Sequence, residues 1–247
     1  MKKLIAVLAI ISFNAHAAPD CRELPSCESL GYICSAEECG DLKALSCPFD
    51  LSKKACFPKD KECEVGDVLY DDLKCHDASC GKTPIAIVYD TELRLAMPLQ
   101  GAINFAWSTV YADVPNLENC AVSAETKTIC GTDGKANTKA IIDYVQESGE
   151  SYPAAEYCYN STFGGLPQGT WWLPSVKEIV AITPSYTNIL NIFLKHGLNF
   201  SGSAFWSSTE NIDTQAHFAK PSTGDTWLNG YYSDKVNGNN VCCITSY

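Results

Sequence analysis

Fourteen cysteines in 247 residues constrain the fold of this chain more than any other feature. Zinc is the competing role, but Cys75, His76 and Cys80 are followed by no second Cys/His pair of finger-like spacing. Disulfide bonds are therefore predicted, in an oxidising compartment and with no metal. The candidates are Cys21, Cys27, Cys34, Cys39, Cys47, Cys56, Cys63, Cys75, Cys80, Cys120, Cys130, Cys158, Cys242 and Cys243.

The first residues have the pattern of a secretory signal peptide. Lys2 and Lys3 precede an apolar run from Leu4 to Phe13, and Ala15-His16-Ala17 places small residues where a signal peptidase cleaves. We expect cleavage after Ala17. The run is shorter than the roughly 20 apolar residues that span a bilayer, and Cys21 lacks a lipoprotein context. An exported periplasmic, cell-surface or extracellular protein is predicted, with no transmembrane segment and no lipid anchor.

The acidic charge excludes one class of partner. The net charge is −11, and removal of Lys2 and Lys3 with the signal peptide brings it near −13. A field of that sign repels phosphate backbones and anionic lipid. Nucleic acid is therefore not an expected partner, and solubility outside the cell is a sufficient reason for the charge.

Residues 18–64 form a distinct cysteine-rich region. They hold seven of the cysteines but few large apolar residues. A segment this small cannot bury enough apolar surface to offset its chain entropy, whereas each disulfide stabilises by roughly 2–4 kcal/mol. A small disulfide-braced region with little regular structure is predicted.

From residue 65 to residue 247 the sequence pattern differs, with longer runs typical of strands and helices. Strands are predicted at Val65–Tyr70, Ile85–Asp90, Arg94–Leu99, Ala204–Ser208, Gln215–Lys220, Asp225–Ser233 and Asn240–Ser246. Helices are predicted from about Ala136 to a stop at Gly149, from Ser175, and from Ser185 to His196. Strands, then helices, then strands predict an α+β domain with a mainly antiparallel sheet and two or three helices.

The numbers of cysteines predict a cross-link between the two regions. Each region holds seven, so at least one bridge must join the regions if all are oxidised. Cys75–Cys80 and Cys120–Cys130 are the expected local pairs, because their loops are short.

Three cysteines then remain in the second region. Two of Cys158, Cys242 and Cys243 would pair while the third reaches the N-terminal region. A vicinal Cys242–Cys243 bridge is the alternative, strained and rarer. Sequence alone does not decide the connectivity.

Several segments of the second region carry motifs of a known family. They are Val65–Tyr70, Gly81–Asp90, Gly134–Thr138, Trp172-Leu173-Pro174-Ser175 with Glu178, and Phe205-Trp206-Ser207-Ser208-Thr209-Glu210. On these motifs the chain resembles the Lcl C-terminal domain family of bacterial exported proteins over about residues 65–247. The resemblance implies a C-type-lectin-like α+β fold, related to that of the formylglycine-generating enzymes. Cys47–Asp50 resembles the cysteine-rich leaders that precede such domains.

Two positions depart from the family pattern. Cys242 stands where the last strand usually has Arg, and Trp172 stands where many members carry Arg before Leu-Pro. The resemblance therefore predicts the fold better than a binding site.

The motifs also have a structural interpretation. Ser175 and Glu178 form a capping box, and such a cap is worth about 1 kcal/mol. Trp172 and Trp206 suit a small mixed core. Ser207, Ser208 and Thr209 are expected to make turn hydrogen bonds at the end of a strand.

Three aromatic residues are the candidate binding surface. Trp171, Tyr231 and Tyr232 each have an adjacent aromatic partner, and neighbours along a strand face opposite ways. One member of each pair is expected to be exposed and to contact a sugar or a protein.

Catalytic motifs are absent from the sequence. There is no Gly-x-Ser-x-Gly, no His-Glu-x-x-His and no phosphate loop, and acidic pairs are too common here to indicate a glycosidase. An oxidase would need a reactive cysteine pair, for which Cys242 and Cys243 are the candidates. Val114-Pro115-Asn116 lacks the carboxylate of a calcium loop.

We therefore predict a non-enzymatic recognition module without a cofactor. It would bind a glycan or a surface protein through loops of a lectin-like scaffold. A structural or assembly role in a cell-surface structure is the alternative.

Overall fold

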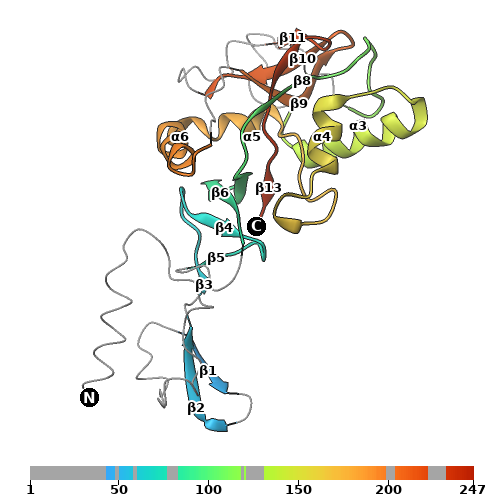
Figure 1. Ribbon diagram of the computed structural model, residues 1–247. Helices are drawn as coiled ribbons and strands as arrows, with labels where there is room; N and C mark the ends of the chain where they lie inside the picture. The colour runs from blue at the N-terminus through green and yellow to red at the C-terminus, as the bar shows by residue number, and fades with distance from the viewer. Residues whose placement is uncertain are drawn as a thin grey trace. The chain divides into compact units, whose positions relative to one another are not determined.

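A computed structural model describes residues 43–47, 50–57, 60–76, 83–117, 120, 131–198, 204–221 and 232–247. The chain forms two compact units (Figure 1). Unit 1 contains residues 1–63 and 68–84, and unit 2 contains residues 64–67 and 85–247. Residues 68–84 thus belong with the cysteine-rich region rather than with the larger unit.

Short strands make up the described part of unit 1. β1 (Lys43–Cys47) and β2 (Asp50–Phe57) form an antiparallel hairpin. β5 (Cys75–His76) pairs antiparallel with both β3 (Asp60–Lys61) and β4 (Val68–Tyr70). In the described residues of 18–64, the prediction of little regular structure was wrong, because hydrogen bonds between strands order residues 43–47, 50–57 and 60–61.

The predicted disulfide between residues 18–64 and residues 65–247 is confirmed, but it uses an unexpected partner. Cys63 is bonded to Cys75, with their Cα atoms 5.3 Å apart. The β3–β5 register places Lys61 opposite Cys75, which brings Cys63 within reach. The predicted Cys75–Cys80 pair was therefore wrong, and Cys80 itself lies outside the described residues.

Unit 2 contains two groups of strands. In the first, β7 (Leu95–Pro98) pairs antiparallel with both β6 (Pro84–Asp90) and β13 (Thr245–Ser246). The second is a five-stranded sheet in the order β11-β10-β9-β12-β8, in which only the β9–β12 pair is parallel. Its strands are β8 (Ile103–Ala106), β9 (Phe205–Ile212), β10 (Gln215–Ala219), β11 (Tyr232–Asp234) and β12 (Gly238–Val241).

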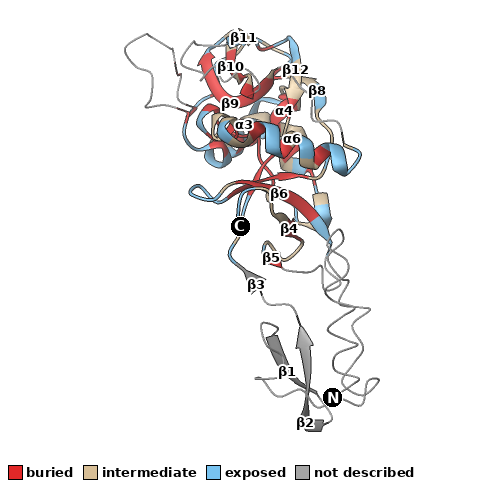
Figure 2. Ribbon diagram, turned by 90° about the vertical axis from the view of Figure 1, so that its left-hand side faces the viewer, coloured by how far each residue is buried: buried red, intermediate tan, exposed pale blue. Residues whose placement is uncertain are grey.

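The helices of unit 2 lie between these strand groups (Figures 1 and 2). They are α3 (Gly134–Ser148), α4 (Pro153–Asn160), α5 (Val176–Val180) and α6 (Tyr186–Lys195). Short 3-10 turns occur at Phe163–Gly165 and Thr183–Ser185. The predicted α+β class with mainly antiparallel strands is confirmed.

Three elements of unit 2 differ from the sequence-based expectation. Strand β8 lies outside every predicted strand. The predicted strand Asn240–Ser246 is divided into β12 and β13, because residues 242–244 carry the chain from one strand group to the other. Helix α4 was not expected; it begins at Pro153, whose fixed φ suits the first position of a helix.

The core of unit 2 is rich in aromatic side chains. Trp107, Trp171, Trp206, Tyr152 and Phe193 are completely or almost completely buried. Figure 2 shows buried residues along β6, β9 and β10. In α3, Gly134, Thr138, Ile141 and Ile142 are buried, whereas Lys135, Ala136, Lys139 and Gln146 are among the exposed residues. The helix therefore presents one face to the core and leaves the other free to form a surface site.

The Glu178 carboxylate joins the N-termini of two helices. Its Oε2 accepts hydrogen bonds from the backbone N–H of Ser175, at 2.7 Å, and of Gly134, at 3.1 Å. Ser175 Oγ accepts from the Glu178 N–H, which completes the predicted capping box on α5. A Cβ on Gly134 would lie only 2.5 Å from the Ser175 nitrogen, so only glycine fits where the start of α3 approaches the backbone at the start of α5.

The Trp-Ser-Ser-Thr motif lies inside β9 rather than at a strand end. Ser207 Oγ donates to the carbonyl of His217 in β10, and Thr209 Oγ1 accepts from the N–H of Val176 in α5. Trp206 Nε1 donates to the Phe105 carbonyl of β8. The motif thus ties β9 to its neighbours. The Thr209 N–H donates to Ser207 Oγ, a local hydrogen bond of the expected kind, but the expected strand end was wrong because β9 continues to Ile212.

Replacing Glu178 by Ala is expected to lower the free energy of unfolding by about 3 kcal/mol, since it leaves two buried N–H groups without an acceptor. Urea denaturation of the purified chain measures this. The matched control is Glu147→Ala on the exposed face of α3, which should change the value by less than about 0.5 kcal/mol. Equal effects of the two substitutions would contradict the assigned role of Glu178.

Candidate functional site

A groove of about 460 Å³ lies on the surface of unit 2 between α3, the end of α4 and the segment 169–172. We call it the α3–α4 groove. Its volume falls in the range of small-ligand sites, about 300–1,000 Å³. Its lining residues are Asp133, Lys135, Ala136, Thr138, Lys139, Tyr159, Gly169, Trp171 and Trp172.

The first two turns of α3 form one wall of the groove. Asp133 caps the helix, because its Oδ1 accepts from the Ala136 N–H at 2.9 Å. Lys135, Ala136 and Lys139 are exposed on this wall. Thr138 is buried, and its hydroxyl donates to the Leu173 carbonyl and accepts from the Leu173 N–H. This reciprocal pair fixes the wall against the segment that carries the tryptophans.

The two tryptophans form a buried floor. Trp171 is completely buried, and its Nε1 donates to the Phe163 carbonyl at 3.3 Å. Trp172 exchanges two backbone hydrogen bonds with Ile244, both of 3.0 Å. The Lys135 ammonium lies 5.2 Å from the centre of the Trp172 ring, a cation–π contact that covers the indole. The floor is therefore rigid and largely shielded from water.

The Tyr159 ring is the partly exposed aromatic surface of the groove. The Gly169 N–H donates to the Tyr159 carbonyl at 2.9 Å. Gly169 has a φ of +81°, and a Cβ there would lie 3.2 Å from the tyrosine ring. Glycine thus allows the loop backbone to pack closely against the ring and hold it in place.

Charges of both signs lie at the groove. Lys139 Nζ forms an ion pair with Asp143 at 2.6 Å, and the hydrogen bond to Asp143 raises the pKa of this ammonium. Asp133 and Lys135 lie two residues apart at the start of α3. Asp133, Lys135 and Lys139 line the groove, and Asp143, outside the lining, neutralises Lys139, so the formal charge is balanced.

The binding residues predicted from sequence are only partly brought together. Trp171 was expected to contact a ligand from an exposed position, but it and Trp172 are both buried, because segment 170–174 is not a regular strand with alternating faces. Trp171 lines the groove only as part of its floor. Tyr232 is 49% exposed on β11, in the five-stranded sheet, and Tyr231 lies outside the described residues.

Sequence reasoning did not find the groove. Asp133, Lys135, Tyr159 and Gly169 come from separate segments that only the fold brings together. The one available signal was that Gly134–Thr138 and Trp172–Ser175 are both segments on which the predicted resemblance to a family rests. In the structure these two segments are neighbours.

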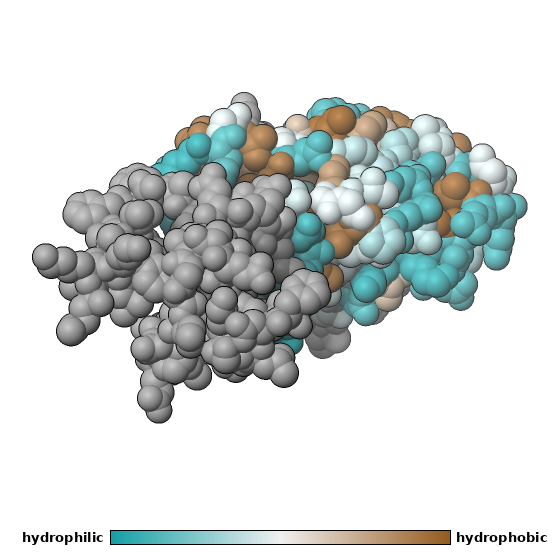
Figure 3. All heavy atoms as spheres, turned by 60° about the horizontal axis from the view of Figure 1, so that its bottom comes forward, coloured by the Kyte–Doolittle hydropathy of each residue, from teal (hydrophilic) through white to brown (hydrophobic). Residues whose placement is uncertain are grey.

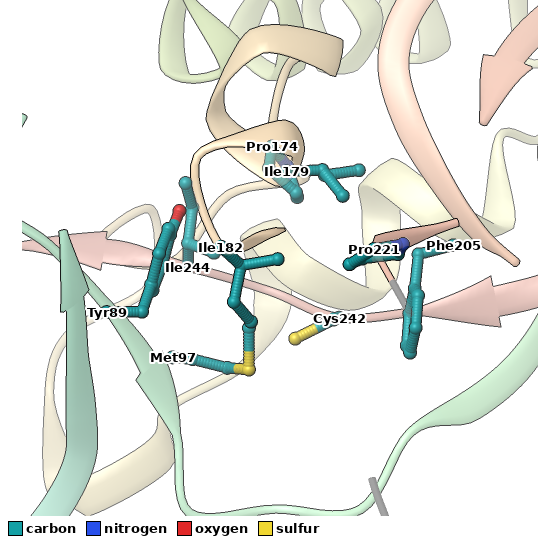
Figure 4. Close-up of a pocket in the computed structure, with 9 residues that line it drawn as sticks. All are labelled: Tyr89, Met97, Pro174, Ile179, Ile182, Phe205, Pro221, Cys242 and Ile244. Atoms are coloured by element: carbon teal, nitrogen blue, oxygen red, sulfur yellow. The ribbon is translucent and has the colours of Figure 1, made fainter. Parts of the chain in front are cut away.

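A free thiol faces a small apolar pocket elsewhere in unit 2. Figure 4 shows the Cys242 sulfur pointing among Met97, Ile182, Pro221 and Phe205. The pocket holds about 10 Å³, which is room for about one water molecule. Cys242 as a residue is partly exposed, but its sulfur is buried, and burial raises the pKa of the thiol. A thiol with a raised pKa is a poor nucleophile.

The C-terminal disulfide links Cys158 of α4 to Cys243, with Cα atoms 5.3 Å apart. The prediction that two of the last three cysteines pair is confirmed. The alternative vicinal bridge was wrong, and so was a bridge from the third cysteine to the N-terminal region, because Cys242 is a free thiol. Cys120 is disulfide-bonded, and its predicted partner Cys130 lies outside the described residues.

A buried ion pair lies inside unit 2. Glu210 and Lys235 are both fully buried, and Lys235 Nζ donates to Glu210 Oε1 and to the Ala112 carbonyl. The ammonium is 4.8 Å from the centre of the Trp107 ring. Burial raises the pKa of Glu210 to about 7, against the opposing effect of Lys235, and burial lowers the pKa of Lys235. The pair has no access to a ligand, and its contacts are structural.

The Glu210 pKa predicts the pH dependence of stability. The pKa is about 7 in the folded chain and 4.5 for an unperturbed carboxyl, so between these values the folded state binds the extra proton. This group's contribution to stability therefore rises as the pH falls from 7 to 5. Urea denaturation across this range should show that the rise is lost in Glu210→Gln and kept in the control Glu147→Gln, an exposed carboxyl on α3. Identical pH profiles for the wild-type chain and Glu210→Gln would contradict the assignment.

Two further observations concern only the described residues. There, no group of three or more His, Cys, Asp and Glu side chains gathers in a way that could hold a metal ion. No helix in that part of the chain is long and apolar enough to cross a membrane.

On the face shown in Figure 3, apolar residues occur as small separate areas among hydrophilic ones.

The fold has a counterpart among solved structures. A fimbrial protein from Bacteroides ovatus ATCC 8483 matches 75% of this chain with a TM-score of 0.53 and 15% identity. This chain covers 49% of that protein, about half its length. Such a likeness shows the fold alone. No family model and no curated protein matches the chain.

Proposed function

We propose that this chain is a non-enzymatic recognition module of the bacterial cell surface that binds a glycan or a protein in the α3–α4 groove. The observation that carries the proposal is the groove itself. It combines a fixed aromatic residue, Tyr159, with exposed ionised groups on α3. Recognition sites commonly combine apolar surface with a few polar groups that fix orientation.

The walls of the groove are rigid, as a preformed site requires. Glu178 fixes the start of α3, the Thr138–Leu173 hydrogen bonds fix the tryptophan segment, and Cys158–Cys243 anchors α4 to the C-terminal segment. A preformed site loses little conformational entropy on binding.

The disposition of the reactive groups favours binding over catalysis. An oxidase would use Cys242 with Cys243, but Cys243 is bridged to Cys158, and the Cys242 thiol is buried with a raised pKa. The carboxyl of raised pKa, Glu210, is fully buried against Lys235. Neither group can approach a ligand in the groove without rearrangement of the core.

A structural or assembly role in a surface structure is the second candidate. It is favoured by the fold likeness to the Bacteroides fimbrial protein. The disulfides of both units fit an oxidising location such as the cell surface. The resemblance to the Lcl C-terminal domain family, with its lectin-like fold, stays a prediction.

Filling the groove tests the recognition proposal. Ala136→Trp places a large ring on the exposed wall of α3, so binding of the mature chain to surface glycans and proteins should fall at least about tenfold, because the ring occupies the ligand's volume. Gln146→Trp, at an exposed α3 position that does not line the groove, is the matched control and should bind as the wild-type chain does. Binding is measured on immobilised glycans and on bacterial surface-protein fractions.

The two candidate functions predict different results. If Ala136→Trp binds every partner as tightly as Gln146→Trp does, the groove is not the recognition site and the assembly role becomes the better account. Circular dichroism and thermal unfolding confirm that both variants are folded before they are compared.

A further inference from the structure

We propose that the ligand of the α3–α4 groove is an uncharged pyranose unit of a glycan. This inference rests on the recognition function proposed above and names its ligand class. Three features support it: the exposed charged groups on the α3 wall, the Tyr159 ring and the balance of charge.

The α3 wall of the groove offers both a hydrogen-bond acceptor and hydrogen-bond donors, which are the two kinds of partner that a sugar hydroxyl needs. A hydroxyl donates one hydrogen bond and accepts others. Asp133 uses Oδ1 to cap α3 and is exposed, so its carboxylate can accept from a hydroxyl. Lys135 and Lys139 are exposed ammonium groups that donate. Carboxylate and ammonium groups side by side match a ring that carries neighbouring hydroxyls.

The aromatic surface suits the apolar face of a sugar ring. Pyranoses present C–H groups on their faces, and these pack on aromatic rings. The Tyr159 ring lines the groove and is held by Gly169, so stacking would need no ordering of a mobile side chain. The Lys135 side chain, which lies over Trp172, is long enough to turn toward a ligand while its stem stays on the indole.

The charge balance favours a neutral ligand over a charged one. Asp133 offsets Lys135 in the lining, and Asp143, which lies outside the lining, offsets Lys139, so neither an anionic nor a cationic group finds an excess of opposite charge. Lys139 is already paired with Asp143. The net charge of −11 adds a field that repels polyanions. A volume of about 460 Å³ suits one or a few sugar rings.

The test is binding of the purified mature chain to soluble oligosaccharides. The probes are neutral hexose and N-acetylhexosamine oligosaccharides, with matched uronate-bearing and sulfated oligosaccharides and a set of charged peptides. Calorimetry and tryptophan fluorescence report binding. We expect binding of at least one neutral class that changes little between about 50 and 500 mM NaCl, because no net charge is paired.

Two substitutions that each remove one charge identify the ligand's charge, because the direction of the change in affinity depends on that charge. Asp133→Asn keeps a good helix cap but removes the negative charge, and Lys135→Met keeps the apolar stem but removes the positive charge. For an uncharged ligand, each substitution weakens binding by about three- to tenfold. An anionic ligand would instead bind more tightly to Asp133→Asn, and a cationic ligand more tightly to Lys135→Met. Lys195→Met, exposed at the end of α6, is the control.

The aromatic contact has its own pair of variants. Tyr159→Ala should weaken binding by about tenfold, whereas Tyr159→Phe should keep most of it, since the ring rather than the hydroxyl makes the contact. Tyr111→Ala, at another exposed tyrosine, should have no effect.

Failure of this inference can be told apart from failure of the proposed function. Groove-dependent binding of an anionic glycan or a peptide, lost in Ala136→Trp, would overturn the neutral-sugar assignment and leave the recognition function standing. Binding of neutral sugars that is unaffected by Ala136→Trp would overturn both. Binding of no glycan at all overturns the sugar assignment, and the Ala136→Trp comparison with protein partners then decides the recognition function.

Discussion

The Glu178 carboxylate is the interaction on which the candidate site depends. It accepts hydrogen bonds from Gly134 at the start of α3 and from Ser175 at the start of α5, and so satisfies buried N–H groups at the starts of two helices at once. Burial raises the pKa of this carboxyl, and the hydrogen bonds from Ser175 and Gly134 oppose that shift. A buried carboxylate held in this way fixes the distance between the helices, and with it the wall of the α3–α4 groove.

In unit 2, the groups with strongly shifted pKa values lie in a different place from the groups that line the groove. Glu210, Lys235 and Cys242 have shifted pKa values but lie inside the core. Asp133, Lys135 and Lys139 at the groove, by contrast, are exposed to solvent. This separation is what a binding module needs, since its site must be accessible and its scaffold must not change when a ligand arrives.

The sequence predicted the parts of the fold that depend on local patterns. The capping box at Ser175 and Glu178, the central strand β6 and the stop of α3 at Gly149 all follow from short-range rules. It did not predict what depends on long-range contacts. Cys63 pairs with Cys75 because of the strand register, and Trp171 is buried because its segment bridges to the C-terminal strand rather than alternating.

Amide hydrogen exchange, read residue by residue, tests the central claim most directly. The comparison is between the wild-type chain and Glu178→Ala under conditions where both remain folded. If the carboxylate holds both helix starts, the amides of Gly134 and Ser175 and the first turn of α3 lose protection in the variant, while β9 and β10 keep theirs. Unchanged protection of Gly134 and Ser175 would contradict the account.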